Sequence, residues 1–184
     1  MITNRVVVAA YQSHDEAEAA IKKLRQAGFD LNKLSIVGRD YLTEEHVVGY
    51  YHTGDRVKFW GKMGGFWGGL FGFFAGSGFF IIPGIGPLLV AGPLVGMIVG
   101  ALEGGVVVGG LSALGAGLCS LGIPKESIMQ YETSLKSGKF VVIAHGSTEE
   151  TGRARELIQS TNPDALAEHQ PENADTNIGR WEHS

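Results

Sequence analysis

Few side chains in this 184-residue sequence have a type and spacing suited to chemistry. Glu103 is the only formally charged residue between Met63 and Pro124, which makes it a candidate for binding a proton or an ion inside an apolar segment. The alternative is that Glu103 marks a helix break or the far interface. His46 and His52 are six residues apart and no cysteine joins them, which favours ordinary histidines over a metal site. We therefore expect no catalytic residue, no metal and no cofactor.

Charge and motif content exclude further classes of protein. The formal net charge is −4, whereas a general nucleic-acid binder normally carries a basic face. No glycine-rich run ends in Gly-Lys-Ser or Gly-Lys-Thr, so no phosphate loop is present. The single cysteine, Cys119, excludes an internal disulfide framework. These features predict a protein that is not an enzyme and does not bind nucleic acid.

Glycine is the most informative residue type. Of the 28 glycines, 20 lie between Gly61 and Gly122, among many aromatic and aliphatic residues. Many of them recur every four residues, which would place small residues on one stripe of a helix where a second backbone can approach closely. The glycines expected at helix–helix contacts are Gly64, Gly68, Gly72, Gly76, Gly92, Gly96, Gly100, Gly104 and Gly109, and a third row continues through Ala113 and Gly117.

The same segment is long enough to suggest a membrane hairpin. As a helix, Met63 to Ile82 would span about 30 Å, one hydrocarbon thickness. The second leg, Leu88 to Leu121, is too long for one crossing, so we expect a break near Glu103. A turn would join the legs through Pro83, Gly84, Gly86 and Pro87, and Arg56, Lys58, Lys62 and Lys125 would keep both ends cytoplasmic. The alternative is a large soluble assembly that buries many hairpins together.

The flanking segments predict an α+β head. Strands are expected at Arg5–Tyr11, Lys33–Gly38, Val47–Tyr51 and Phe140–Ala144. Helices are expected between Ser13 and Gly28, from Pro124 to Gly138, and after the capping-box pair Ser147 and Glu150. This order matches a ferredoxin-like split βαβ head, formed by residues 1–60 and 123–160 and interrupted by the hairpin at 61–122. Residues 161–184 are acidic and polar, which predicts a disordered tail.

Two parts of the sequence resemble bacterial general stress, or heat-induced stress, proteins. Residues 6–38 (VVVAAYQSHDEAEAAIKKLRQAGFDLNKLSIVG) resemble the N-terminal unit of that family. The run IPGIGPLLVAGPLVG at 82–96, followed by a glycine zipper and Gly122-Ile123-Pro124, is similar to its membrane-hairpin members. The resemblance covers roughly residues 5–160. It implies a stress-associated, membrane-linked protein and supplies no catalytic residues.

Taken together, these observations predict a non-enzymatic membrane protein that assembles with itself and with lipid through glycine-zipper helices. One alternative is a scaffold whose hairpins form a chamber for lipid or a quinone that serves a partner enzyme. Another is a regulatory module whose head binds a small ligand. Trp181 in the tail is a candidate anchor for a partner protein, with simple disorder as the competing interpretation.

Overall fold

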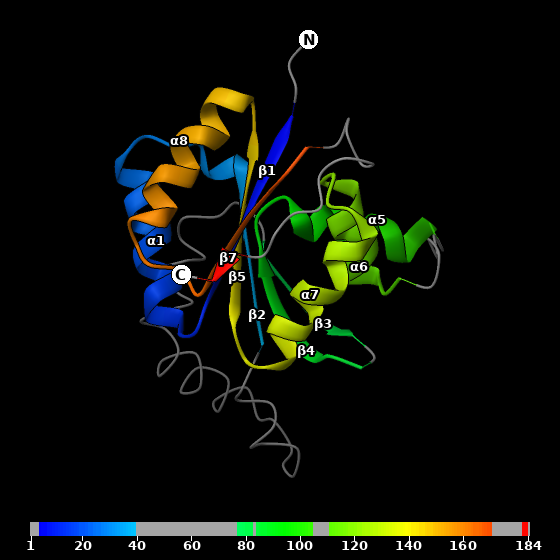
Figure 1. Ribbon diagram of the computed structural model, residues 1–184. Helices are drawn as coiled ribbons and strands as arrows, with labels where there is room; N and C mark the ends of the chain where they lie inside the picture. Colours follow the sequence, from blue (N-terminus) through cyan, green and yellow to red (C-terminus); the bar gives the residue numbers. More distant parts are fainter. Residues whose placement is uncertain (1–3, 40–76, 83, 105–110, 171–181, 184) are drawn as a thin grey trace, which may run out of the picture.

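Seven strands form one sheet in the computed structural model, which describes residues 4–39, 77–82, 84–104, 111–170 and 182–183. The strand order is β3-β4-β2-β5-β1-β6-β7, and every neighbouring pair is antiparallel (Figure 1). The strands are β1 (Arg5–Tyr11), β2 (Leu34–Arg39), β3 (Ser77–Ile82), β4 (Gly86–Ala91), β5 (Phe140–Gly146), β6 (Ala165–His169) and β7 (Glu182–His183). The helices are α1 (His14–Gln26), α5 (Leu94–Gly104), α6 (Ala113–Ser120), α7 (Lys125–Lys136) and α8 (Thr148–Gln159), with a short 3₁₀ turn at Leu31–Lys33. The predicted α+β class is confirmed.

The four central strands interleave two β-α-β units. In the order β2-β5-β1-β6, the strands of the unit β1-α1-β2 flank β5, and those of the unit β5-α8-β6 flank β1. This interleaving is the connectivity of split βαβ units. The elements that fill it differ from the prediction, because α8 is the second crossover helix and α7 is not. The strand predicted at Val47–Tyr51 lies outside the described residues.

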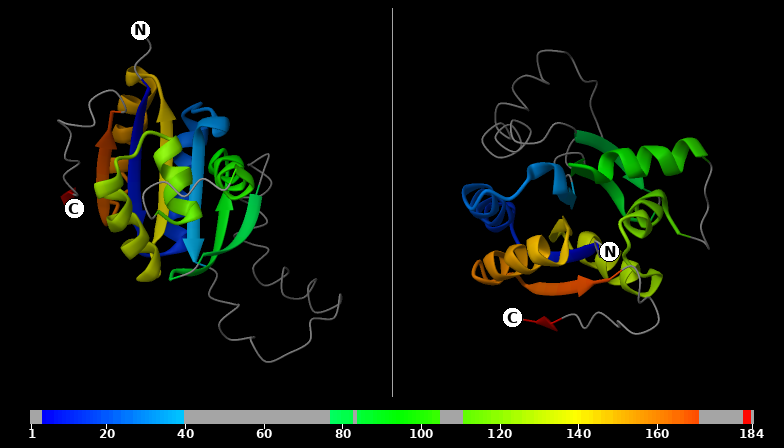
Figure 2. Two further views of the ribbon diagram at one scale, coloured as in Figure 1. Left: turned by 90° about the vertical axis from the view of Figure 1, so that its right-hand side faces the viewer. Right: turned by 90° about the horizontal axis from the view of Figure 1, so that it is seen from above.

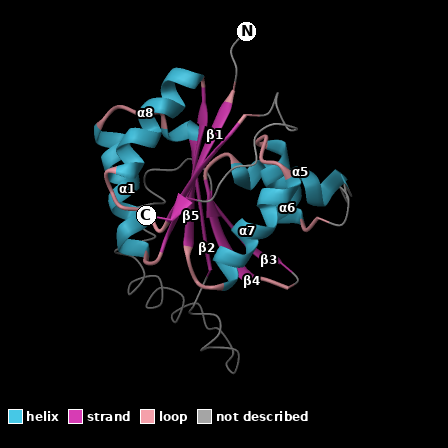
Figure 3. Ribbon diagram, in the orientation of Figure 1, coloured by secondary structure: helices cyan, strands magenta, loops and turns pink. Residues whose placement is uncertain are grey.

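Helices cover both faces of the sheet (Figures 1 and 3). On one face, α1 and α8 pack on alternate strand residues such as Val7 and Val142, whereas α5, α6 and α7 cover their neighbours, such as Val8 and Val141, on the other. A strand buried on both faces needs apolar side chains at successive positions rather than at every second one. This requirement explains the unbroken apolar run of β1, in which residues 6–11 are all fully buried.

Local signals set the ends of several elements where the sequence predicts them. Ser13 begins α1, its Oγ accepting the Glu16 N–H at 3.3 Å, and Gly28 follows the helix with a φ of +82°. Ser147 and Glu150 form the predicted capping box of α8. Such caps depend on a few adjacent residues and little else, so sequence alone can place them.

The prediction of a helical hairpin is wrong for the described part of the glycine-rich segment. Ser77–Ile82 and Gly86–Ala91 are strands β3 and β4, and β4 pairs with β2 in the register Ile36↔Ala91. The turn between them therefore joins two strands, with Gly84 and Gly86 at φ values of +86° and +102°. The apolar runs Phe79–Ile82 and Leu88–Ala91 are short and lie next to a Gly/Pro turn, which suits strands, and β-branched and aromatic residues favour a pleated surface. The segment is thus part of the head's own sheet and core.

The remainder of the predicted second leg forms two short helices rather than one long one. The helix α5 ends at Gly104, where the break near Glu103 was expected, and α6 packs beside it as a separate helix. Of the helices in the described ranges, none combines the length and the apolar character that a bilayer crossing would require.

The prediction of a disordered tail is also wrong in part. Residues Ala165–His169 form β6, which pairs with β1 over five positions from Val6↔His169 to Ala10↔Ala165. Glu182 and His183 add the two-residue strand β7 to the outer edge of β6 (Figure 2). The short run Ala165-Leu166-Ala167 is apolar enough to pair once a sheet edge is available. Because polar residues flank it, the sequence pattern alone does not indicate a strand there.

Candidate functional site

Contacts with β2 fix the start of α5. The N–H of Leu94, which has no partner within its own helix, donates a hydrogen bond of 3.2 Å to the buried Oγ of Ser35. Gly92 lies just before the helix with a φ of +98°, and a Cβ atom on it would lie 2.2 Å from the carbonyl oxygen of Leu34. The backbones of β2 and residue 92 can approach this closely only because residue 92 is glycine.

One side of α5 packs on the sheet and on α6. Leu94 and Ile98, four residues apart, are both fully buried. Gly117 of α6 faces them, and a Cβ atom there would lie 2.9 Å from Ile98 Cγ1 and 3.2 Å from Leu94 Cδ1. Ser112 ties α6 to α7, since its Oγ accepts the Gly115 N–H and donates to Glu132 at 2.8 Å. A glycine thus does permit close helix packing here, within one chain.

The opposite side of α5 is exposed and almost uncharged. We call its residues Gly96, Val99, Gly100, Leu102 and Glu103 the α5 outer face. Val99 is 36% exposed and Leu102 is 57% exposed. A Cβ atom at Gly96 or Gly100 would meet nothing within 4 Å, so this face is a shallow apolar surface without a neighbour among the described residues. Glu103 lies at its C-terminal end and is exposed to solvent, not enclosed in an apolar environment.

The predicted helix-packing glycines do not share one role. Gly92 is a junction residue, and Gly96, Gly100 and Gly104 are on α5, where they are at least partly open to solvent. Gly84 and Gly86 shape the turn into β4, and Pro87 lies within that strand opposite Ile81. Six of the predicted positions, together with Trp181, lie outside the described residues: Gly64, Gly68, Gly72, Gly76, Gly109 and Pro83.

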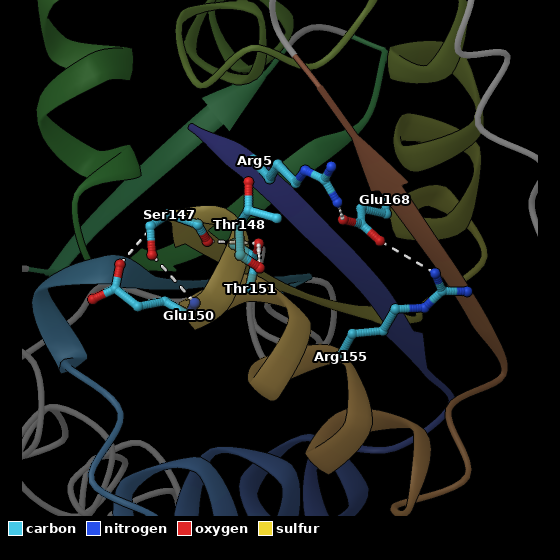
Figure 4. A network of polar contacts seen from close by, with 7 residues as sticks. All are labelled: Arg5, Ser147, Thr148, Glu150, Thr151, Arg155 and Glu168. Atoms are coloured by element: carbon cyan, nitrogen blue, oxygen red, sulfur yellow. Dashed lines mark hydrogen bonds and ion pairs between the residues drawn. The ribbon is translucent and has the colours of Figure 1, made fainter. Parts of the chain in front are cut away.

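A second polar feature lies at the end of the sheet where β1 begins, on the α8 side (Figure 4). Glu168 of β6 accepts hydrogen bonds from Arg5 of β1 at 3.0 Å and from Arg155 of α8 at 3.2 Å. Near the start of α8, Glu150 accepts from Lys33 at 2.6 Å and caps the Ser147 N–H at 2.9 Å. The Lys33 ammonium and the Ser147 N–H lower the pKa of Glu150 to about 2. These contacts join four elements at one end of the sheet.

The opposite face at the same end holds a buried pair that the sequence did not reveal. The Tyr131 hydroxyl of α7 hydrogen-bonds His169 Nε2 of β6, and both residues are fully buried. Burial lowers the pKa of His169 from 6.5 to about 4 and raises that of Tyr131 well above its usual value. His169 Nδ1 is buried and has no hydrogen-bond partner among the described residues. Complete burial keeps this pair away from any substrate, so its role is within the fold.

His145 lies near this pair on the same face. In the sheet register, Val6 of β1 is opposite both His145 of β5 and His169 of β6. Burial and the nearby Lys33 ammonium lower the pKa of His145. Across the part of the chain that the structure describes, no three His, Cys, Asp or Glu side chains come together to hold a metal ion.

Comparison with known families agrees with the first half of the predicted resemblance. Residues 6–79 match the model of the heat-induced stress protein YflT domain, a range that begins in β1 and ends within β3. The match supports a place among general stress proteins. It does not extend to the residues after 79, on which the predicted similarity to membrane-hairpin members chiefly rested. Neither a curated protein nor a solved structure matches the chain.

Proposed function

We propose that this chain is a non-enzymatic protein of the stress response that assembles with further copies of itself through the α5 outer face. The observation that carries the proposal is the exposure of Val99 and Leu102 beside two glycines with open space above them. Small residues let two helix backbones come close, and the flanking aliphatic side chains then bury apolar area. The family match supports the link to stress.

The composition of α5 favours a second helix over a lipid surface as its partner. The helix has 11 residues, or about 16 Å, and carries neither lysine nor arginine. Helices that lie on anionic membranes normally present basic residues at the lipid headgroups. A second α5 outer face, by contrast, offers the same small and aliphatic residues and is complementary in kind.

Charge also selects the orientation of such a pair. Suppose that two α5 helices cross antiparallel midway between Gly96 and Gly100. Each Glu103 is then five residues from the crossing point, so the two carboxylates lie about 15 Å apart along the helix axes. A parallel crossing would bring them together, and like charges in contact are unfavourable. The proposed assembly is therefore antiparallel and has two-fold symmetry, which closes a dimer.

Gly96→Leu and Val99→Asp test the proposal by sedimentation over a concentration series. Leucine at position 96 meets open space in the monomer and would block only a neighbouring helix. We expect wild-type protein to self-associate. Each variant should raise the dissociation constant of the dimer about tenfold or more while its circular dichroism spectrum stays unchanged. Met129→Asp is the matched control, because Met129 is an apolar residue of α7, 71% exposed and outside the α5 outer face.

Two results would contradict self-assembly through α5. One is a wild-type protein that stays monomeric at every concentration. The other is an equal loss of association in Met129→Asp, which would indicate a general effect of surface apolarity. Binding of wild-type protein, but not Val99→Asp, to neutral or anionic vesicles without self-association would assign the same face to a lipid surface instead.

A further inference from the structure

The strand β6 is the last of the four central strands in the sequence and lies at the end of the order β2-β5-β1-β6. It follows every described helix in the sequence, and among the described residues only the two of β7 pair with its outer edge. Two of its four buried side chains, Ala165 and Ala167, are small, and the larger two are Leu166 and His169. If β6 left the sheet, β1 would still pair with β5 along seven residues. Local opening of β6 is therefore possible without unfolding the rest of the protein.

Polar contacts on both faces hold β6 in place at neutral pH. On the α8 side, Glu168 binds Arg5 and Arg155. On the α7 side, His169 Nε2 binds the Tyr131 hydroxyl, and the two rings meet edge to face with centroids 5.8 Å apart. The first residue pair of the strand is also anchored, because the Asp164 N–H donates to the Ala10 carbonyl at 2.8 Å.

We propose that His169 and Tyr131 form an acid-sensitive latch, which holds β6 against β1 at neutral pH and releases it when the imidazole becomes protonated. A neutral imidazole carries one N–H, whereas the imidazolium has two N–H donors and a positive charge. The Tyr131 hydroxyl can accept from Nε2, but Nδ1 has no acceptor among the described residues. A buried charge with an unmade hydrogen bond is costly, and release of the strand returns it to water.

The surroundings of His169 offer little to stabilise the cation. Val6 of β1 lies beside it, and beyond Val6 is His145 of β5, a group that would itself become positive. The neighbouring Glu168 favours protonation, but its carboxylate is on the other face, bound to two arginines. On α7, besides Tyr131, Glu132 is engaged by Ser112 and the remaining charges are exposed: Lys125, Glu126 and Lys136. Desolvation consequently outweighs the single favourable charge.

The size of the effect follows from linkage. With a pKa of 6.5 when β6 is released and about 4 when it is docked, the opening equilibrium increases about eightfold between pH 7 and pH 5.5, and about sixtyfold by pH 4.5. The sign is fixed, because the released state binds more protons at every pH in this range. Acid therefore favours opening, and return to neutral pH restores the docked strand.

Amide hydrogen exchange of the full-length protein tests the latch. Rates are corrected for the intrinsic pH dependence of exchange and measured with and without a low urea concentration. We expect β6 amides to lose protection about eightfold by pH 5.5. We also expect the free energy of opening of the β6 amides to be lower than that of central β5 amides such as Val142. Its urea dependence should be weaker as well, because release of β6 exposes little surface.

His169→Gln is the decisive variant. Glutamine can accept a hydrogen bond from the Tyr131 hydroxyl but does not titrate. The eightfold loss of β6 protection between pH 7 and pH 5.5 should therefore fall to less than about twofold. His14→Gln, at an exposed position of α1, should retain the full change, and His145→Gln separates the effect of the half-buried His145 on the same face. Retention of the wild-type pH profile in His169→Gln would overturn the latch.

Two further results would also overturn it, even if that variant failed to fold. One is exchange of wild-type β6 amides only together with those of central β5, which would mean global unfolding without a latch. The other is an NMR titration of the wild-type imidazoles in which His169 becomes protonated near pH 6.5 with β6 still docked. A His169 resonance that stays neutral below pH 5.5 in the docked state supports the proposal.

Discussion

Replacing Gly92 with alanine is expected to lower the free energy of unfolding by about 3 kcal/mol or more. The residue has a φ of +98°, a conformation that an L side chain rarely adopts. Its new Cβ would lie 2.2 Å from the Leu34 carbonyl oxygen and 2.9 Å from Ser35 Cα, and both are backbone atoms of β2. The strand or the start of α5 must therefore move, and the hydrogen bond from Leu94 to Ser35 would be lost with it. Urea unfolding followed by circular dichroism measures the change.

Gly96→Ala is the matched control for Gly92→Ala, four residues further along the chain. It lies within α5, and its Cβ would meet nothing within 4 Å. Alanine is the better helix former, so we expect stability to increase by about 0.5–1 kcal/mol. The two substitutions should thus act with opposite sign. Equal destabilisation by both would instead favour a continuous glycine row in one helix.

The stability of the wild-type protein should fall by about 2.5 kcal/mol between pH 7 and pH 4.5 through His169 alone. Burial lowers the folded-state pKa of this histidine to about 4, against 6.5 in the unfolded chain. Over that interval the unfolded state binds more protons, so stability is complete above pH 6.5 and decreases as the pH falls towards 4. Urea unfolding at half-unit pH steps measures the slope.

His169→Gln isolates this contribution from the other titrating groups. His145 also has a lowered pKa and acts in the same direction, so some pH dependence should remain in the variant. Glu150, whose pKa is lowered to about 2, loses its contribution only below its ordinary value of 4.5, outside the interval tested. An unchanged slope in His169→Gln would show that the histidine is not desolvated in solution.

Together these expectations describe a protein in which the described part of the glycine-rich segment belongs to the sheet and core of the head. Gly92 and Gly117 allow close contacts inside one chain, whereas Gly96 and Gly100 leave an open surface on the same helix. Gly92 and Gly96 belong to the same row of glycines spaced four residues apart, yet their substitution by alanine is expected to change stability in opposite directions. Only the substitutions at exposed positions are expected to separate assembly from folding.

Local signals in the sequence define several elements without reference to the rest of the chain. The Ser13 and Ser147 caps, the φ > 0 glycines after α1 and α7, and the apolar runs of β1 and β5 are all readable from a few neighbouring residues. These features placed the first β-α-β unit and the α+β class correctly, whereas the second unit, β5-α8-β6, was missed because β6 lies in the part predicted to be disordered. They also indicated the break at the end of α5, because Glu103 and its glycines interrupt an apolar helix.

Contacts between distant segments, by contrast, set the conformation of the described parts of the apolar glycine-rich stretch and the polar tail. A run such as Phe80-Ile81-Ile82 suits a buried helix or a strand equally well, and the free edge of β2 beyond β5 made the strand the better solution. In the same way, β6 gains its hydrogen bonds and the Tyr131–His169 contact only beside β1, from a helix 38 residues distant in sequence. Neither partner is visible locally, because burial and pairing energies arise between segments that the fold alone brings together.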